Sequence, residues 1–402
     1  MTDRDRAAPA TGRRAGGAGE VFLAALRLGL TSFGGPVAHI GFFRDEYVRR
    51  RRWLDDEAFS ELVALASVLP GPSSSQLGIA IGALRAGKLG GLAAWVGFTL
   101  PSAALMTAFA LGVAGADVQG AGWLHGLELA AAAVVATAVV QMARALAPDA
   151  PRLALAAGAT AAVLAVGGAV AQVAVIAAGA LAGLALLRGG AEPPPVRLRF
   201  PVGRGLAAAS LALFAVLLAA LPLLSGRAGG HALELADAFY RSGALVFGGG
   251  HVVLPLLDAA VVEPGWASRE EFLAGYGAVQ AMPGPLFTFA SYLGAVQEPE
   301  PSGVAGAALA TAAIFAPSFL LLAGVAPLWA AYRSHPRVRA ALAGVGAAVV
   351  GLLAAALWTP VLTGAVDSVG DGALAVAFLA VLRLAPVWAV VAAAAALGAL
   401  LS

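Results

Sequence analysis

The sequence predicts an all-α polytopic membrane protein made of two inverted homologous halves. We expect about nine spanning helices plus re-entrant broken helices at two Pro-Gly-Pro motifs, about 10–13 segments in total. Three observations predict this: the composition, an internal repeat, and loop charges that change sign between the two copies. The chain is 60% hydrophobic and 12% charged, whereas soluble proteins are about 45–50% apolar and about 25% charged. Lipid must therefore be the solvent for much of the chain.

Composition also excludes several classes of function. A formal net charge of only +2 gives no reason to expect nucleic-acid binding. The absence of cysteine excludes disulfides, thiolate metal sites and cysteine nucleophiles. The five histidines show no paired spacing typical of a metal site, and there is no Walker-type phosphate-binding motif. We therefore expect no cofactor, no metal site and no catalytic residues.

The second half of the chain repeats landmarks of the first in the same order. The recurring pairs are Phe33-Gly34-Gly35 with Phe247-Gly248-Gly249, Trp53 with Trp266, Pro70-Gly71-Pro72 with Pro283-Gly284-Pro285, and Pro101-Ser102 with Pro317-Ser318. The separation stays between 213 and 216 residues, which chance similarity between Ala-rich and Gly-rich helices would not produce. The expected organisation is a disordered cytoplasmic tail (1–19), a first repeat (20–190), a linker with one spanning helix (191–230) and a second repeat (231–402).

Loop charges predict that the two copies point in opposite directions. Arg49–Arg52, and later Arg85 and Lys88, follow the motifs of the first copy. The matching loops of the second copy carry Asp258 and Glu263, then Glu298 and Glu300. Because arginine and lysine collect on the cytoplasmic side, the same loops lie inside in one copy and outside in the other. This predicts that the N-terminus lies inside, and inverted repeats place a substrate site near the midplane.

Each Pro-Gly-Pro motif splits an apolar segment that lies between flanks of one charge sign. The first splits residues 54–84 into arms of about 14 residues, about 21 Å as helix, short of a ~30 Å hydrocarbon core. A re-entrant hairpin with its tip at the motif satisfies both facts. The alternative is a spanning helix that is merely kinked there. Helix starts bind anions, so the candidate site residues are Gly71, Ser73, Ser74, Ser75, Gly284 and Thr288.

The Phe-Gly-Gly motifs predict a second break, between arms 20–32 and 37–48 in the first copy. Glycine lets a ligand approach the backbone closely, so the next candidates are Gly34, Gly35, Gly248 and Gly249. His39 and His251 either relay protons or bind the anion, or are packing residues. The charged coupling candidates are Arg27, Arg44, Glu128 and Arg241. Snorkelling, solvated loop charges or a helix-end role are the alternatives for these four.

Several motifs together resemble the chromate ion transporter family. In the first half they are Phe33–Ile40, Arg44–Val48, Arg52–Leu54, Leu69–Gln76 and Leu100–Ser102. In the second half they are Phe247–His251, Met282–Pro285 and Ala316–Ser318, which resemble the C-terminal copy of the long, two-domain members. The resemblance adds Gln76 and Gln280 to the candidate site, although Ser67 replaces the glutamine expected before the first Pro-Gly-Pro. It implies a multi-pass protein of the bacterial cytoplasmic membrane that exports chromate from the cytosol, confers chromate resistance and is inhibited by sulfate.

Two alternatives to chromate export stay open at this stage. One is export of another inorganic or organic anion. The other is a membrane-embedded enzyme, which needs a carboxylate pair, a metal cluster or an activated nucleophile at membrane depth; the sequence offers none of these. The expected partners are chromate or sulfate and the lipid bilayer, with a homodimer as the remaining candidate.

Overall fold

A computed structural model describes residues 16–114, 122–187, 200–228, 230–247, 252–332 and 335–401, and within these ranges the chain is helical with no strand. The predicted all-α class is therefore confirmed. Three candidate site residues, Gly248, Gly249 and His251, lie outside the described residues, as does most of the predicted N-terminal tail.

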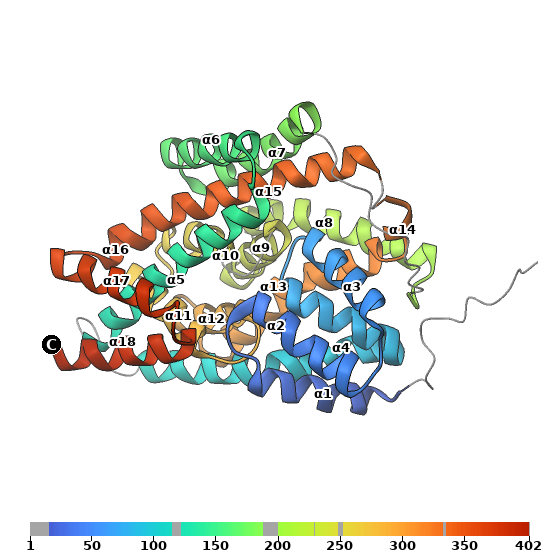
Figure 1. The fold of residues 1–402 in the computed structure, drawn as a ribbon, viewed down its shortest axis with the longest axis horizontal. Helices are drawn as coiled ribbons and strands as arrows, with labels where there is room; N and C mark the ends of the chain where they lie inside the picture. Colours follow the sequence, from blue (N-terminus) through green and yellow to red (C-terminus); the bar gives the residue numbers. More distant parts are fainter. Residues whose placement is uncertain are drawn as a thin grey trace, which may run out of the picture.

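The two repeats fold into matching series of helices (Figure 1). The first contains α1 (Ala18–Thr31), α2 (Gly35–Phe43) with the π-helical turn η1 (Arg44–Arg50), α3 (Asp56–Val68), α4 (Ser73–Ala114), α5 (Gly122–Leu146), α6 (Ala150–Val166) and α7 (Gly168–Leu186). The connecting helix is α8 (Arg204–Ala228). The second contains α9 (Gly230–Leu245), α10 (Val253–Leu257) with η3 (Asp258–Val262), α11 (Arg269–Ala281), η4 (Leu286–Thr288), α12 (Phe289–Val296), α13 (Gly303–Val325), α14 (Trp329–Tyr332), α15 (Pro336–Ala356), η5 (Leu357–Leu362), α16 (Thr363–Ala365), α17 (Val369–Val381) and α18 (Val387–Leu401).

Helix α4 is two helices joined by a sharp turn. Ala86 and Gly87 leave the helical conformation, and Gly87 has a φ of 67° that suits glycine. On either side of the turn, Gly82 and Gly90 pack backbone to backbone, so that a Cβ on either would collide with the other. Gly294 of α12 and Gly306 of α13 repeat this contact in the second copy. Small residues allow the close helix approach that packing inside a membrane requires.

The long helices that follow these turns, α4 after residue 88 and α13, run antiparallel to one another. Trp95 contacts Phe319, with ring centroids 5.6 Å apart. Leu111, sixteen residues further along α4, lies beside Gly303 at the opposite end of α13, where a Cβ would be 3.9 Å from its Cδ2 atom. Because α4 and α13 occupy equivalent places in the two repeats, the second repeat is inverted relative to the first, as the loop charges predict.

The two repeats are interleaved. The terminal pair of each copy packs on the long helix of the other: α17 and α18 on α5, and α6 and α7 on α15 (Figure 1). Glycines again make these contacts close, with Gly126 and Gly398 at the α5–α18 contact and Gly183 and Gly344 at the α7–α15 contact. The two repeats are therefore separate along the sequence but do not form separate domains, because each one packs its terminal helices on the other.

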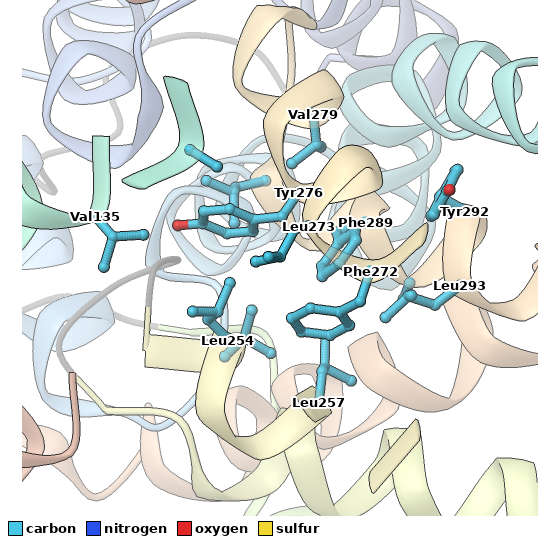
Figure 2. Packing of buried hydrophobic residues seen from close by; sticks show 14 of the residues in the cluster. Val135, Leu254, Leu257, Phe272, Leu273, Tyr276, Val279, Phe289, Tyr292 and Leu293 are labelled. Carbon is cyan, nitrogen blue, oxygen red and sulfur yellow. The ribbon is translucent and has the colours of Figure 1, made fainter. Parts of the chain in front are cut away.

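The main hydrophobic core lies where α5, α10, α11 and α12 meet. Figure 2 shows the Tyr276 ring of α11 between Val135 of α5 and Leu254 of α10, with Phe289 of α12 close by. Tyr276 and Phe289 are fully buried and their ring centroids lie 5.7 Å apart. This core encloses the segments that lead to the second Pro-Gly-Pro motif, and so fixes their position.

By length and composition, 5 of the described helices could cross a membrane: Ser73–Gly112, Gly122–Leu146, Arg204–Gly226, Gly303–Val325 and Pro336–Ala365. The predicted total of about nine crossings also counted the terminal pairs, α6–α7 and α17–α18. These four helices have 13 to 19 residues, at or below the about 20 needed for a perpendicular span. Each pair packs along a long helix of the other copy.

The interleaved packing predicts a large difference between two glycine variants of neighbouring helices. Gly183→Val places a side chain against the Ala340 and Gly344 backbone, whereas a Cβ on Gly158 of α6 meets nothing within 4 Å. Overpacking of this kind costs about 1–3 kcal/mol, while both variants share the same intrinsic helix cost of valine. We expect a lower melting temperature of the detergent-solubilised protein for Gly183→Val than for Gly158→Val. Equal melting temperatures would contradict the described α7–α15 contact.

Candidate functional site

Both Pro-Gly-Pro motifs interrupt helices at the predicted places. In the first copy α3 ends at Val68 and α4 begins at Ser73. In the second, α11 and α12 lie side by side, because the Tyr292 hydroxyl donates to the Glu271 carbonyl over 3.0 Å and Phe289 packs on Phe272. The second motif is therefore the tip of a hairpin, and α3 and α4 also pack on each other. A merely kinked continuous helix is not what the structure shows. We call residues 70–72 and 283–285 the first and second tip.

Each tip is hydrogen-bonded to the other repeat by an equivalent contact. The Gly71 N–H donates to the Val246 carbonyl over 2.7 Å, and the Gly284 N–H donates to the Ser32 carbonyl over 2.9 Å. Val246 and Ser32 each directly precede a Phe-Gly-Gly motif. These two N–H groups, which the sequence offered as anion donors, instead hold the repeats together. Both glycines have positive φ angles, 116° and 97°, which other residues rarely adopt.

A buried serine of the opposite repeat faces each tip. A Cβ on Gly71 would lie 2.6 Å from Ser318 Oγ, and one on Gly284 would lie 2.9 Å from Ser102 Oγ. Both serines are fully buried. The Gln76 amide adds a third group at the first tip, donating to the Pro70 carbonyl over 2.6 Å and to Ser318 Oγ over 3.4 Å. The tips are thus lined by neutral polar groups of both repeats.

Several polar atoms close in sequence to these contacts are buried without a hydrogen-bond partner among the described residues. They are Ser32 Oγ, Ser75 Oγ, the Gln76 side-chain oxygen, Trp95 Nε1 and Thr99 Oγ1. The Gln280 side chain contacts the Tyr276 hydroxyl. A buried polar group without a partner costs about 1–3 kcal/mol, so native structures retain few of them. Most of these groups can donate a hydrogen bond. Their chemistry fits a bound oxyanion or ordered water.

The first Phe-Gly-Gly motif forms the predicted break between α1 and α2. Gly34 and Gly35 have φ angles of 94° and 75°. His39 follows on α2, is almost fully buried, and lies edge-on against Phe98 at 5.4 Å between ring centroids. Since the Phe98 carbonyl also faces Gly284, His39 belongs to the surroundings of the second tip. Gly34, Gly35 and His39 therefore lie on the segment that surrounds the second tip, and not at the first tip.

The helices that follow the two tips begin differently. The Gln76 N–H donates to Pro72 over 2.9 Å, so the N–H groups of Ser73, Ser74 and Ser75 precede the first hydrogen bond of α4. In the second copy the Thr288 hydroxyl donates back to the Pro285 carbonyl over 2.8 Å. The two helix starts therefore offer different donors to a ligand.

The charged candidates lie away from the tips. Arg27 is exposed on α1, and Arg44 pairs with Asp56 of α3 over 2.7 Å. Arg241 pairs with Asp237 over 2.7 Å beside a cavity of about 480 Å³, which Glu234 and Glu263 also line. This cavity carries more carboxylates than cations, so it does not suit an anion. Glu128, on α5, is buried and contacts His125 over 3.4 Å.

The structure adds residues that sequence reasoning did not select. Ser102 and Ser318 were visible as parts of the repeated Pro-Ser motif, but nothing in the sequence showed that they face the opposite tip. Ser32 and Thr99 gave no signal beyond their proximity to motifs. His125 and Asp371, which contact each other over 3.0 Å, are 246 residues apart, so only the folded chain brings them together.

Comparisons with known proteins agree on one family. The chromate transporter family model matches residues 19–184 and 233–399. A chromate transport protein of Pseudomonas aeruginosa is 30% identical over 84% of this chain and 79% of its own length. One of Cupriavidus metallidurans is 28% identical over 83% and 80%, and a probable chromate transport protein of Synechococcus elongatus is 28% identical over 83% and 81%. No solved structure matches the chain.

Proposed function

Because the chain belongs to the chromate transporter family, we propose that it is a secondary transporter that exports chromate from the cytoplasm and confers chromate resistance. Sulfate, which is also a tetrahedral dianion, is the expected competitor. The N-terminus lies in the cytoplasm, and the proton gradient or the membrane potential drives export. The relatives with whole-length matches are named as chromate transport proteins, which supports transport rather than an enzymatic role.

The observation that carries the proposal is the group of unpartnered polar atoms around the tips. A tetrahedral oxyanion accepts several hydrogen bonds at once, and the hydroxyls of Ser32, Ser75 and Thr99 are buried without partners. The free N–H groups at the start of α4 add the positive end of a helix dipole. These donors are neutral, so they hold the anion without the strong attraction of a fixed cation and allow it to leave.

Each tip donates one hydrogen bond to the opposite repeat, and these two hydrogen bonds suggest how the site opens. The Gly71–Val246 and Gly284–Ser32 contacts close the tips against the opposite repeat. For an anion to enter or leave, one tip must separate from the other repeat while the second stays closed. Two equivalent closures that face opposite directions supply the two gates that alternating access needs.

Transport by membrane vesicles tests this proposal. Inside-out vesicles that contain the protein should accumulate labelled chromate, and excess sulfate should reduce the uptake; vesicles without the protein provide the baseline. If sulfate has no effect but another anion competes, the substrate is that anion. If the protein is present in the membrane and neither chromate nor sulfate moves, the proposal fails.

A further inference from the structure

We propose that His125, Glu128 and Asp371 form a proton-binding site that couples anion movement to the proton gradient. This inference rests on the proposed transport function. The three side chains meet where α5 of the first repeat packs against α17 of the second (Figure 1). His125 Nε2 lies 3.0 Å from Asp371 Oδ1, and His125 Nδ1 lies 3.4 Å from Glu128 Oε2. One imidazole therefore bridges carboxylates of the two inverted halves.

Asp371 is held in place as a hydrogen-bond acceptor. Its Oδ2 atom accepts from the Ser368 backbone N–H over 2.9 Å and from the Ser368 hydroxyl over 2.8 Å. The Asp367 N–H donates to the same oxygen over 3.2 Å. Donors to Oδ2 favour the ionised carboxylate, so the free Oδ1 faces His125 as an acceptor. His125 Nε2 must then carry a hydrogen.

The second contact requires one more proton. With Nε2 protonated, a neutral imidazole presents a lone pair at Nδ1, which would face a lone pair of an ionised Glu128 carboxylate at 3.4 Å. The contact is favourable if the proton sits on Nδ1, giving an imidazolium beside a carboxylate. It is equally favourable if the proton sits on Glu128, giving an acid that donates to Nδ1. In both forms the His125–Glu128 pair binds one proton.

The two members of the His125–Glu128 pair differ in exposure. His125 and Asp371 line a cavity of about 340 Å³ whose other walls are small and apolar residues of α5, α17 and α18. The His125 side chain is 37% exposed, and that of Glu128 is 7% exposed. Two further carboxylates, Glu270 at the start of α11 and Asp367 before α17, interact with Glu128 through their charge.

Helix α11 connects this site to the second tip. The Leu127 backbone, next to Glu128, packs directly against Gly277 of α11, where a Cβ would collide with it. Gly277 lies one turn before Ala281, the end of α11, and the tip follows immediately. A proton bound by the His125–Glu128 pair changes the contact between α5 and α17. Because α5 packs on α11, this change reaches the helix that leads to the second tip. This connection makes the site a coupling site rather than an isolated surface pair.

The test separates transport from coupling in one preparation of proteoliposomes. Exchange of labelled for unlabelled chromate, without a pH gradient, measures transport. Accumulation driven by an imposed pH gradient measures coupling. Glu128→Gln should keep exchange near the wild-type rate and reduce accumulation by about tenfold or more. Wild-type-like accumulation by Glu128→Gln would overturn the inference, whereas absence of exchange by the wild-type protein would overturn the transport function itself.

The chain supplies a matched control. His231 and Glu234 form a second His-x-x-Glu pair, with Nδ1 and Oε2 3.3 Å apart, but Glu234 is 45% exposed and His231 Nε2 meets Gln297 instead of a carboxylate. Glu234→Gln should leave both measurements unchanged; a loss equal to that of Glu128→Gln would count against a specific site.

A spectroscopic measurement keeps the inference testable even if Glu128→Gln does not fold. In detergent-solubilised protein with ¹⁵N-labelled histidine, the His125 signal is assigned by its absence in His125→Gln. Replacing Asp371 by asparagine should shift the His125 Nε2 resonance, because the anionic acceptor 3.0 Å away is lost. An unchanged Nε2 resonance in that variant would overturn the inference.

Discussion

Gly71→Leu should abolish chromate transport while the protein remains inserted in the membrane. The new side chain would occupy the space now filled by Ser318 Oγ, 2.6 Å from a Cβ at this position, and by the Gln76 amide nitrogen at 2.7 Å. It would also separate the Gly71 N–H from Val246. Gly284→Leu should act in the same way against Ser102. Labelled chromate uptake by vesicles, normalised to protein content, measures the effect. If both variants transport normally, the tips are not the site.

Two matched variants separate loss of space from backbone strain. Gly87 also has a positive φ, 67°, but a Cβ there meets nothing within 4 Å. Gly87→Ala therefore carries a backbone strain of about 1–3 kcal/mol without filling the site, and it should transport. The combination of Gly71→Ala with Ser318→Gly removes the hydroxyl that the new methyl group meets. It should recover activity relative to Gly71→Ala alone; no recovery would point to backbone strain or to the remaining contact with the Gln76 amide nitrogen at 2.7 Å.

The inverted arrangement predicts an all-or-none labelling result. The native chain has no cysteine, so an introduced thiol reports alone. Arg50 and Glu263 occupy equivalent places in the repeats, 213 residues apart, and both are exposed. In intact cells a membrane-impermeant maleimide should label Glu263→Cys and spare Arg50→Cys.

Opening the cells should make both positions reactive, which shows that the thiol at position 50 is accessible from the inside. Equal labelling of the two variants in intact cells would place both loops on one face of the membrane. That outcome would contradict the antiparallel arrangement and the pair of opposed gates drawn from it.

Much of the architecture could be predicted from the sequence because it depends on local signals. Proline lacks a backbone donor and glycine accepts positive φ, so the breaks at Pro70–Pro72 and at Gly34 are encoded in single residues. The inverted orientation was readable because positive charge collects on one side of a membrane. The helix starts at Asp56 and Arg269 follow capping residues, Asp55 and Ser268, for the same local reason.

The partners across the two repeats could not be predicted, because they depend on how long helices pack. The sequence marked Gly71 and Gly284 as anion donors, but their N–H groups bond to Val246 and Ser32 of the other repeat. Thr288 resembled Ser75 by position, yet its hydroxyl is used by Pro285. Glu128 was selected alone, since nothing in a linear reading places Asp371 beside His125.

The exchange of terminal helix pairs has a consequence for the order of assembly during synthesis. Helix α5 leaves the ribosome long before its covering helices α17 and α18, which lie in the second repeat. Until they arrive, the small-residue face around Gly126 must be occupied by lipid or a chaperone. The packing of α5 is therefore completed only when α17 and α18 are made, and a variant that lacks α18 would leave the Gly126 face of α5 uncovered.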